Sequence, residues 1–339
     1  MKVKREEFLA LLTEATIGLS KKEILEQSNC FIFHKGLVLT FNDEIFFSCE
    51  SPLDFDAIVP AEDLLKILTR LPDEEIDVRL ESNEMILEGK RRDVGITVEA
   101  ELHLPFDAVP SPGKWLRLTP DLPGMLQQAA RTCGSDETQY KTTCVHVTPD
   151  LVEASDNYRI FRADLQTGFN SEILIPASSI NTLSKIILKR VNVGEGWVHF
   201  TTGARRLISI RCSHETYHEG IEEMLVVEGT EISLPKNLGE MIGRAEVMNI
   251  TGYDARISLT IHENLLQIMS QKDGGWFREK KRIKYSGERL RFDVHPQFMA
   301  EVLERTHKII IGSSKLKLEA EGIQFVVSLD MEDTGDIPF

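Results

Sequence analysis

The chain has 339 residues, of which 42% are hydrophobic and 27% are charged, a composition typical of a soluble globular protein. At about 100–200 residues per domain, this length indicates two or three domains. The formal net charge of −15 argues against a protein that coats nucleic acid with its whole surface, but it does not exclude one basic face.

One unit of sequence recurs three times, and each copy has an apolar strand, a proline, a short amphipathic helix and two further strands. In the first copy the strand ends at Pro60, and Leu64, Leu65 and Leu68 then form one helical stripe. The alternating pattern of residues 76–80 predicts a half-buried antiparallel strand. A proline suits a helix start because its missing N–H would be unpaired there anyway.

The second and third copies follow Pro176 and Pro296, so the marker prolines lie about 120 residues apart. Their expected apolar stripes are Ile180, Leu183, Ile186 and Ile187 in the second copy, and Phe298, Val302 and Leu303 in the third. An additional helix is expected before each marker proline, within residues 3–19, 120–134 and 235–249.

These elements predict an α+β fold of three similar domains, each with two helices packed on antiparallel sheets. Turn-rich residues 108–114 and the acidic stretch 228–233 mark the expected boundaries. The predicted domains are 1–112, 113–230 and 231–331, followed by an acidic tail at 332–339.

Basic residues recur at matched places on or beside these helices. They are Lys21, Lys22, Lys66, Arg70, Arg131, Lys185, Lys189, Arg190, Arg244, Arg305 and Lys308. Cations that contact phosphates bind duplex DNA without reading its sequence. A single such face would more often be an ordinary solvated surface, because lysine and arginine are usually exposed. The threefold recurrence favours DNA binding.

The phrase VEASDNYRIFRADL around residues 155–160 resembles a segment of the bacterial DNA polymerase III beta subunit, the beta sliding clamp family. FDAIVPAEDLLKILTRLPDEEIDVRLE, SLPKN and IKYSGERLRFDV also resemble that family, in the same order along residues 1–331. Asn157 and Tyr158 replace the glycine and histidine of the family, so the chain looks like a divergent member, of bacterial or phage origin.

The resemblance implies a sliding clamp: a non-enzymatic processivity factor without a cofactor, closed as a ring-shaped homodimer around duplex DNA. It also implies a groove between the second and third domains that tethers DNA polymerase and the clamp loader. The implied groove residues are Ser155, Asn157, Tyr158, Arg159, Ile160, Leu225, Val326, Val327, Leu329 and Met331. Tyr140 and Lys141 fall in a loop that touches DNA in the family.

The last residues, Asp336, Ile337, Pro338 and Phe339, resemble the tip of bacterial single-stranded DNA-binding protein. Such a tip docks through an aromatic side chain, so proteins that recognise it are predicted partners. A frayed acidic terminus without a partner, or a tail folded back into the groove, are the alternatives.

The sequence His214-Glu215-Thr216-Tyr217-His218 fits the H-E-x-x-H pattern of zinc metallopeptidases, which requires a helix to bring both histidines to one metal. A strand is expected just before it, and Gly220 would cut a helix short. A zinc metallopeptidase is therefore a weaker hypothesis than a sliding clamp. A non-encircling replication adaptor is the other alternative. The five scattered cysteines, without a CxxC pair, and the lack of a long apolar run favour a cytoplasmic protein without a membrane partner.

Overall fold

The computed structural model describes residues 1–23, 25–203, 205–252, 255–304 and 306–329, except for the side chain of Lys185. Two compact units make up this part of the chain. The first contains Met1–Ala130, His146–Asp150 and Gln166–Thr216, and the second contains Arg131–Val145, Leu151–Leu165 and the chain from Tyr217 onward.

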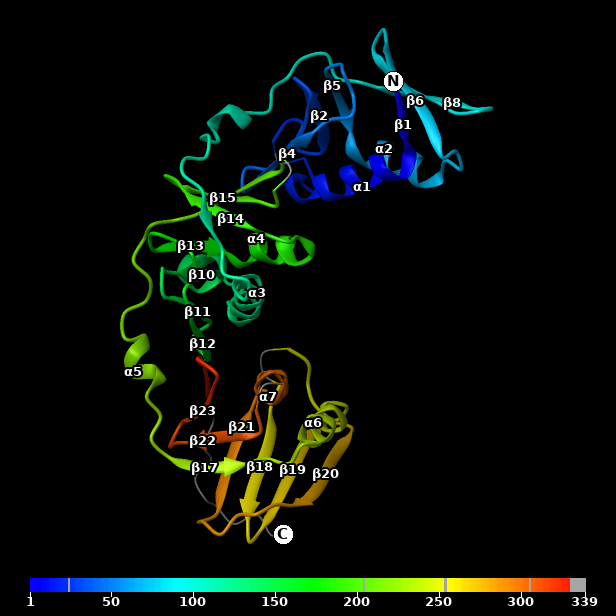
Figure 1. Ribbon diagram of the computed structural model, residues 1–339. Coiled ribbons are helices and arrows are strands. Elements are labelled where there is room, and N and C mark those ends of the chain that lie inside the picture. Colours follow the sequence, from blue (N-terminus) through cyan, green and yellow to red (C-terminus); the bar gives the residue numbers. More distant parts are fainter. Residues whose placement is uncertain (24, 204, 253–254, 305, 330–339) are drawn as a thin grey trace. The chain divides into compact units, whose positions relative to one another are not determined.

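The same series of ten elements occurs three times (Figure 1). The first repeat contains β1 (Lys2–Lys4), α1 (Arg5–Ala15), β2 (Cys30–His34), β3 (Leu37–Phe41), β4 (Ile45–Glu50), β5 (Ala57–Pro60), α2 (Ala61–Arg70), β6 (Glu75–Glu81), β7 (Glu84–Glu88) and β8 (Asp93–Thr97).

The second repeat contains β9 (Leu116–Arg117), α3 (Leu122–Thr132), β10 (Cys144–Val147), β11 (Leu151–Ser155), β12 (Arg159–Asp164), β13 (Ile173–Pro176), α4 (Ala177–Thr182), β14 (Arg190–Val193), β15 (Trp197–Thr201) and β16 (Leu207–Arg211). Short 3-10 turns precede and follow some of these elements, including η3 (Glu137–Thr143) and η4 (Leu183–Lys185).

After α5 (Ile221–Leu225), the third repeat contains β17 (Thr230–Ser233), α6 (Leu238–Glu246), β18 (Ile257–His262), β19 (Leu265–Lys272), β20 (Gly275–Arg282), β21 (Leu290–Val294), α7 (Pro296–Leu303), β22 (Lys308–Ile311), β23 (Lys315–Ala320) and β24 (Ile323–Ser328). The threefold α+β organisation inferred from the marker prolines is therefore present.

The marker prolines join strand to helix without a loop. Pro60 and Pro176 are the last residues of β5 and β13, directly before α2 and α4, and Pro296 is the first residue of α7. At each position the fixed φ of proline suits the turn into a helix, and no intrahelical hydrogen bond is lost.

Antiparallel pairing fuses neighbouring repeats into continuous sheets. In the first unit the strand order is β5-β2-β3-β4-β16-β15-β14-β9, so β4 of the first repeat pairs with β16 of the second. In the second unit β12 of the second repeat pairs with β24 of the third. The second repeat is divided between the two compact units because each of its halves shares a sheet with a different neighbour.

Each four-stranded sheet has one edge strand that occupies a notable place in the repeat series. The order β1-β6-β7-β8 leaves β8 at one edge, and the order β20-β19-β18-β21 leaves β20 at another. In the repeat series, β8 corresponds to β16 and β24, and β20 corresponds to β4 and β12. These two edge strands, β8 and β20, are thus the counterparts of the strands that join the repeats.

Each helix buries an apolar stripe on a sheet. Leu64 and Leu68 of α2 are fully buried, and Figure 1 shows α6 and α7 side by side on one face of the β18, β19 and β20 sheet. The expected stripe of the second repeat is partly wrong. Because α4 ends at Thr182 and η4 at Lys185, Ile187 lies beyond the helical segment and is 78% exposed.

Candidate functional site

A tight turn begins β12 and orients the functional segment of the second repeat. Asn157 adopts a left-handed backbone with φ of 73°, a conformation that asparagine tolerates better than most residues. The Asp156 carboxylate accepts hydrogen bonds from the backbone N–H groups of Tyr158 and Arg159. The side chain of Asp156 is thus fixed inside its own turn.

Arg159 connects this turn to the third repeat. Its Nε donates to Asp156 at 2.9 Å, its Nη1 to Glu301 at 2.8 Å, and its Nη2 to the carbonyl oxygen of Arg131 at 2.7 Å. The residue is only 9% exposed, and its guanidinium carbon lies 4.0 Å from the centroid of the Phe298 ring. Such a cation, both paired and stacked, holds its neighbours in one geometry.

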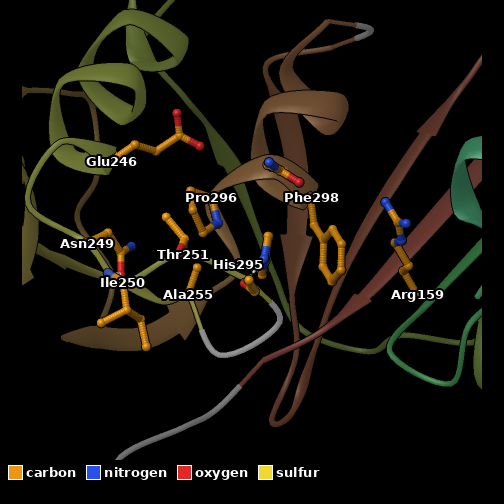
Figure 2. A pocket seen from close by; sticks show the side chains of 11 residues that line it. Arg159, Glu246, Asn249, Ile250, Thr251, Ala255, His295, Pro296 and Phe298 are labelled. Atoms are coloured by element: carbon orange, nitrogen blue, oxygen red, sulfur yellow. Dashed lines mark hydrogen bonds between the residues drawn. The ribbon is translucent and has the colours of Figure 1, made fainter. Parts of the chain in front are cut away.

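A pocket of about 460 Å³ opens beside Arg159, within the second unit (Figure 2). One wall comes from the end of α6 and the turn after it, and the other comes from Arg159 and the start of α7. Its lining residues are Arg159, Glu246, Asn249, Ile250, Thr251, Gly252, Ala255, His295, Pro296, Gln297 and Phe298.

His295 forms the floor between these walls. Its ring stacks on Phe298 with centroids 4.4 Å apart, and its Nε2 donates to the carbonyl oxygen of Gly252 at 3.1 Å. Burial lowers the pKa of His295, and the neighbouring Arg256 and Arg159 act in the same direction, against the opposing effects of the hydrogen bond to Gly252 and of the Glu246 carboxylate. The ring is therefore neutral at physiological pH, with the proton on Nε2.

The predicted groove residues are brought together at the β12–β24 junction. Arg159 faces Val327, Ile160 faces Val326, and α5, which carries Leu225, packs against β24. Most of these side chains are less than 10% exposed, namely Ser155, Arg159, Ile160, Leu225, Val326, Val327 and Leu329. Asn157 and Tyr158 are exposed, Tyr158 at 52%, and Met331 lies outside the described residues.

The pocket beside Arg159 is the open surface, and it adjoins the predicted groove without coinciding with it. Glu246, Asn249, Ile250, His295 and Phe298 line it, and the sequence reasoning did not select any of them as site residues. The strand-Pro296-helix signal had located the start of α7, where His295 and Phe298 lie. The end of α6 carried no comparable signal, because its approach to α7 depends on tertiary packing.

The predicted DNA-binding residues are mostly exposed but do not all lie on helices. Lys66 and Arg70 are on α2, Arg131 ends α3 and Arg244 is on α6. Three of them lie at or just before strand starts and not on helix faces: Lys189, Arg190 and Lys308. Lys66 is paired with Glu62, and Arg244 is paired with Glu279.

Other predicted DNA contacts lie in loops. Lys21 and Lys22 are exposed after the first helix, and Tyr140 and Lys141 lie on η3, with Tyr140 41% exposed. Arg305, the side chain of Lys185 and the tail residues Asp336, Ile337, Pro338 and Phe339 lie outside the described residues. The roles of all these residues remain predictions.

The H-E-x-x-H sequence lacks the helix that zinc binding by this motif requires. Residues 214–218 have no helical structure, and α5 begins only at Ile221, after Gly220 with φ of 82°. His214 Nε2 lies 3.1 Å from the carbonyl oxygen of Gly194. In the described part of the chain, no cluster of three or more His, Cys, Asp or Glu side chains has the geometry of a metal site. The described helices also include none with the length and apolar character of a membrane span.

Solved structures similar to this chain are bacterial sliding clamps. The DNA polymerase III beta chain of Streptococcus pneumoniae superposes with a TM-score of 0.85 at 15% identity, over 98% of this chain and 99% of that one. The DNA polymerase sliding clamp of Bacillus subtilis gives 0.81 at 15% identity, with the same coverage of both chains. The DNA polymerase III beta subunit of Thermotoga maritima gives 0.80 at 18% identity, again over 98% and 99%.

No protein-family model matches the sequence, and no curated protein sequence does. At identities of 15–18% the structural likeness establishes the fold. The described chain has the sliding-clamp fold over nearly its whole length.

Proposed function

We propose that this protein is a sliding clamp, a DNA polymerase processivity factor that encircles duplex DNA as a head-to-tail homodimer. The observation that carries the proposal is the repeated junction. The strand pairs β4–β16 and β12–β24 join the three repeats in the same way, and β8 and β20 are the corresponding strands at the two ends of the series.

The two edge strands supply the closure of the ring. An exposed edge strand is a template for pairing with another chain. Two copies arranged head to tail would pair β20 of each with β8 of the other, and that contact closes instead of growing into a fibre. Main-chain hydrogen bonds between the paired strands would form this junction.

The existing junctions also give the register of this contact. Phe47 faces Ile208 in one junction, and Phe161 faces Phe325 in the other. Aligning the hairpins places Glu279 of β20 opposite Val94 of β8 in the second copy. Lys280 then faces Asp93, and Phe277 faces Ile96. An opposite-charge pair and an apolar pair across the strands both favour this register.

Binding to DNA would be independent of sequence. The exposed side chains of Lys22, Lys66, Arg70 and Arg131 can contact phosphates, and such contacts hold DNA while allowing sliding. Because a closed ring leaves DNA only by opening or at a free end, weak phosphate contacts suffice. The net charge of −15 then limits unspecific adhesion elsewhere on the surface.

Polymerase and clamp loader are the proposed protein partners. Ligand pockets typically have volumes of about 300–1,000 Å³ and combine apolar walls with a few polar groups. The pocket between the end of α6 and the start of α7 meets this description at about 460 Å³. Its position beside the β12–β24 junction supports a tethering role for this face of the second unit.

Cysteine cross-linking tests the ring directly. In the double variant Lys280→Cys, Asp93→Cys, oxidation should link two copies through two disulfides, because facing residues in a strand pair lie within reach of such a bond. Lys280→Cys with Thr97→Cys is the matched control, since the second position lies about 13 Å further along β8. The five native cysteines are free, and four of them are buried.

The cross-linked protein should remain on nicked circular DNA in high salt and slide off the same DNA after linearisation. Equal retention on both forms would remove the encircling mechanism. A stable monomer with no cross-linking in either variant would instead favour a non-encircling adaptor.

A further inference from the structure

Among the described residues, some polar and charged groups around the pocket of the second unit have hydrogen-bond partners within the protein, and one carboxylate does not. All three nitrogens of the Arg159 guanidinium donate to the protein itself, and the His295 Nε2 proton is committed to Gly252. Both ends of the Asn249 amide are engaged, by Arg256 and Ile250. No cationic group in the described lining is therefore available to an incoming acidic ligand.

The carboxylate of Glu246 is different. It lies at the exposed end of α6 and has no hydrogen-bond or ion-pair partner among the described residues. Figure 2 shows Glu246 on the wall opposite Phe298 and Arg159. An unpaired carboxylate at the rim of a pocket attracts a cation and repels an anion.

The rest of the lining is suited to an apolar side chain. Ile250 is 51% exposed at the mouth, although large aliphatic side chains are usually buried, and Ala255 and Phe298 form the interior. The described lining thus combines several apolar side chains with one carboxylate at the rim, that of Glu246.

We propose that this pocket binds a short segment of a partner protein that inserts one apolar side chain against Phe298 and Ile250 and places a lysine or arginine against Glu246. The inference rests on the proposed tethering function and adds a charge rule to it: the clamp selects basic docking segments and rejects acidic ones. Specificity of this kind uses repulsion as well as attraction.

The chain's own tail does not fit this rule. Residues 330–339 include Asp330, Glu332, Asp333 and Asp336, and they contain no lysine or arginine. Their charge has the same sign as that of Glu246, so the pocket disfavours them as an occupant. A partner with a basic segment is the occupant to which the inference commits.

Selection of short random peptides displayed on phage tests the rule on the full-length protein. Sequences recovered on the native chain should combine an apolar residue with an enriched lysine or arginine, and those recovered on Glu246→Lys should be enriched in Asp or Glu. For one recovered peptide made synthetically, Glu246→Gln should weaken binding about two- to fivefold, the effect of one exposed ion pair. This loss should shrink as salt is added.

Two matched controls keep the test specific. Glu240→Lys makes the same charge change on the same helix, outside the pocket lining, and should leave the recovered sequences unchanged. Ile250→Asp should abolish binding of the synthetic peptide, whereas Val247→Asp, at a residue that is 66% exposed but outside the lining, should not.

The inference is wrong if the recovered peptides show no basic enrichment, if Glu246→Lys recovers the same sequences, or if no peptide is recovered at all. It is also wrong if peptides bind only after residues 330–339 are deleted, because the tail would then be the occupant. None of these results affects retention on circular DNA, which tests the proposed function separately.

Discussion

The guanidinium carbon of Arg159 lies 4.0 Å from the centroid of the Phe298 ring, so a strand of the second repeat and a helix of the third meet at one cation–π contact. The same guanidinium pairs with Asp156 and Glu301. This contact connects the β12–β24 junction to the pocket, so a change at Arg159 should affect both stability and binding.

Replacing Arg159 with alanine should lower the free energy of unfolding by about 3–5 kcal/mol, because the nearly buried Asp156 carboxylate would lose its cation. Denaturation in urea measures the change. Arg278→Ala removes an exposed arginine stacked on Trp276 and should cost about 1 kcal/mol or less. Equal effects of the two substitutions would contradict the structural role assigned to Arg159.

Acid should destabilise the protein through His199. Burial lowers the pKa of this histidine to about 4, against about 6.5 in an unfolded chain. Between these values the unfolded chain binds more protons, so stability is complete above pH 6.5 and falls as pH decreases toward 4. The loss contributed by His199 is about 3 kcal/mol. In urea titrations at several pH values, His199→Gln should flatten this part of the curve, and His103→Gln, at an exposed histidine, should not.

Gly168 is required by a close backbone approach. Its φ is +87°, and a Cβ atom there would lie 2.2 Å from the carbonyl oxygen of Arg117. Gly168→Ala should therefore cost well above the roughly 1–2 kcal/mol of a left-handed alanine alone. Gly196→Ala is the control, since Gly196 has a φ of +69° and open space around it. Equal unfolding temperatures for the two variants would show that the close approach of Gly168 to the Arg117 carbonyl does not require glycine.

Exchanging charges should test the strand register of the dimer. Lys280→Glu would face Asp93 across the proposed contact, and Asp93→Lys would face Lys280. Because the symmetric dimer contains this pair twice, each single variant should weaken dimerisation about four- to twenty-five-fold. The double variant restores an opposite-charge pair and should recover the native dissociation constant. Sedimentation equilibrium measures all three. Additive losses in the double variant would rule out this register.

Phosphate contact by α2 should appear in the salt dependence of DNA binding. Arg70→Gln should weaken binding to duplex DNA of any sequence and reduce the slope of log affinity against log salt by about one. Lys90→Gln removes another exposed charge, in the turn between β7 and β8, and should leave the slope unchanged. If both variants behave alike, the contribution is one of net charge and not of position.

Local sequence determined the repeated architecture. Proline fixes φ at any position, and the periods of 3.6 and two residues are set by backbone geometry, so Pro60, Pro176 and Pro296 and the stripes around them located three similar units. Ile187 shows that apolar periodicity did not predict where the helical segment ends. The apolar period continued past the residue at which the helical segment stops, and helix ends are poorly specified by periodicity.

Only the tertiary structure decided which surface is open. The sequence indicated the residues of the β12–β24 junction, but pairing of those strands buries Ile160, Val326 and Val327. The pocket instead forms where the end of α6 approaches the start of α7, so that Glu246 and Phe298 line one cavity although they lie far apart along the chain. Periodicity describes which face of an element is buried, whereas a cavity depends on how two elements pack, and that distance is not encoded in either segment alone.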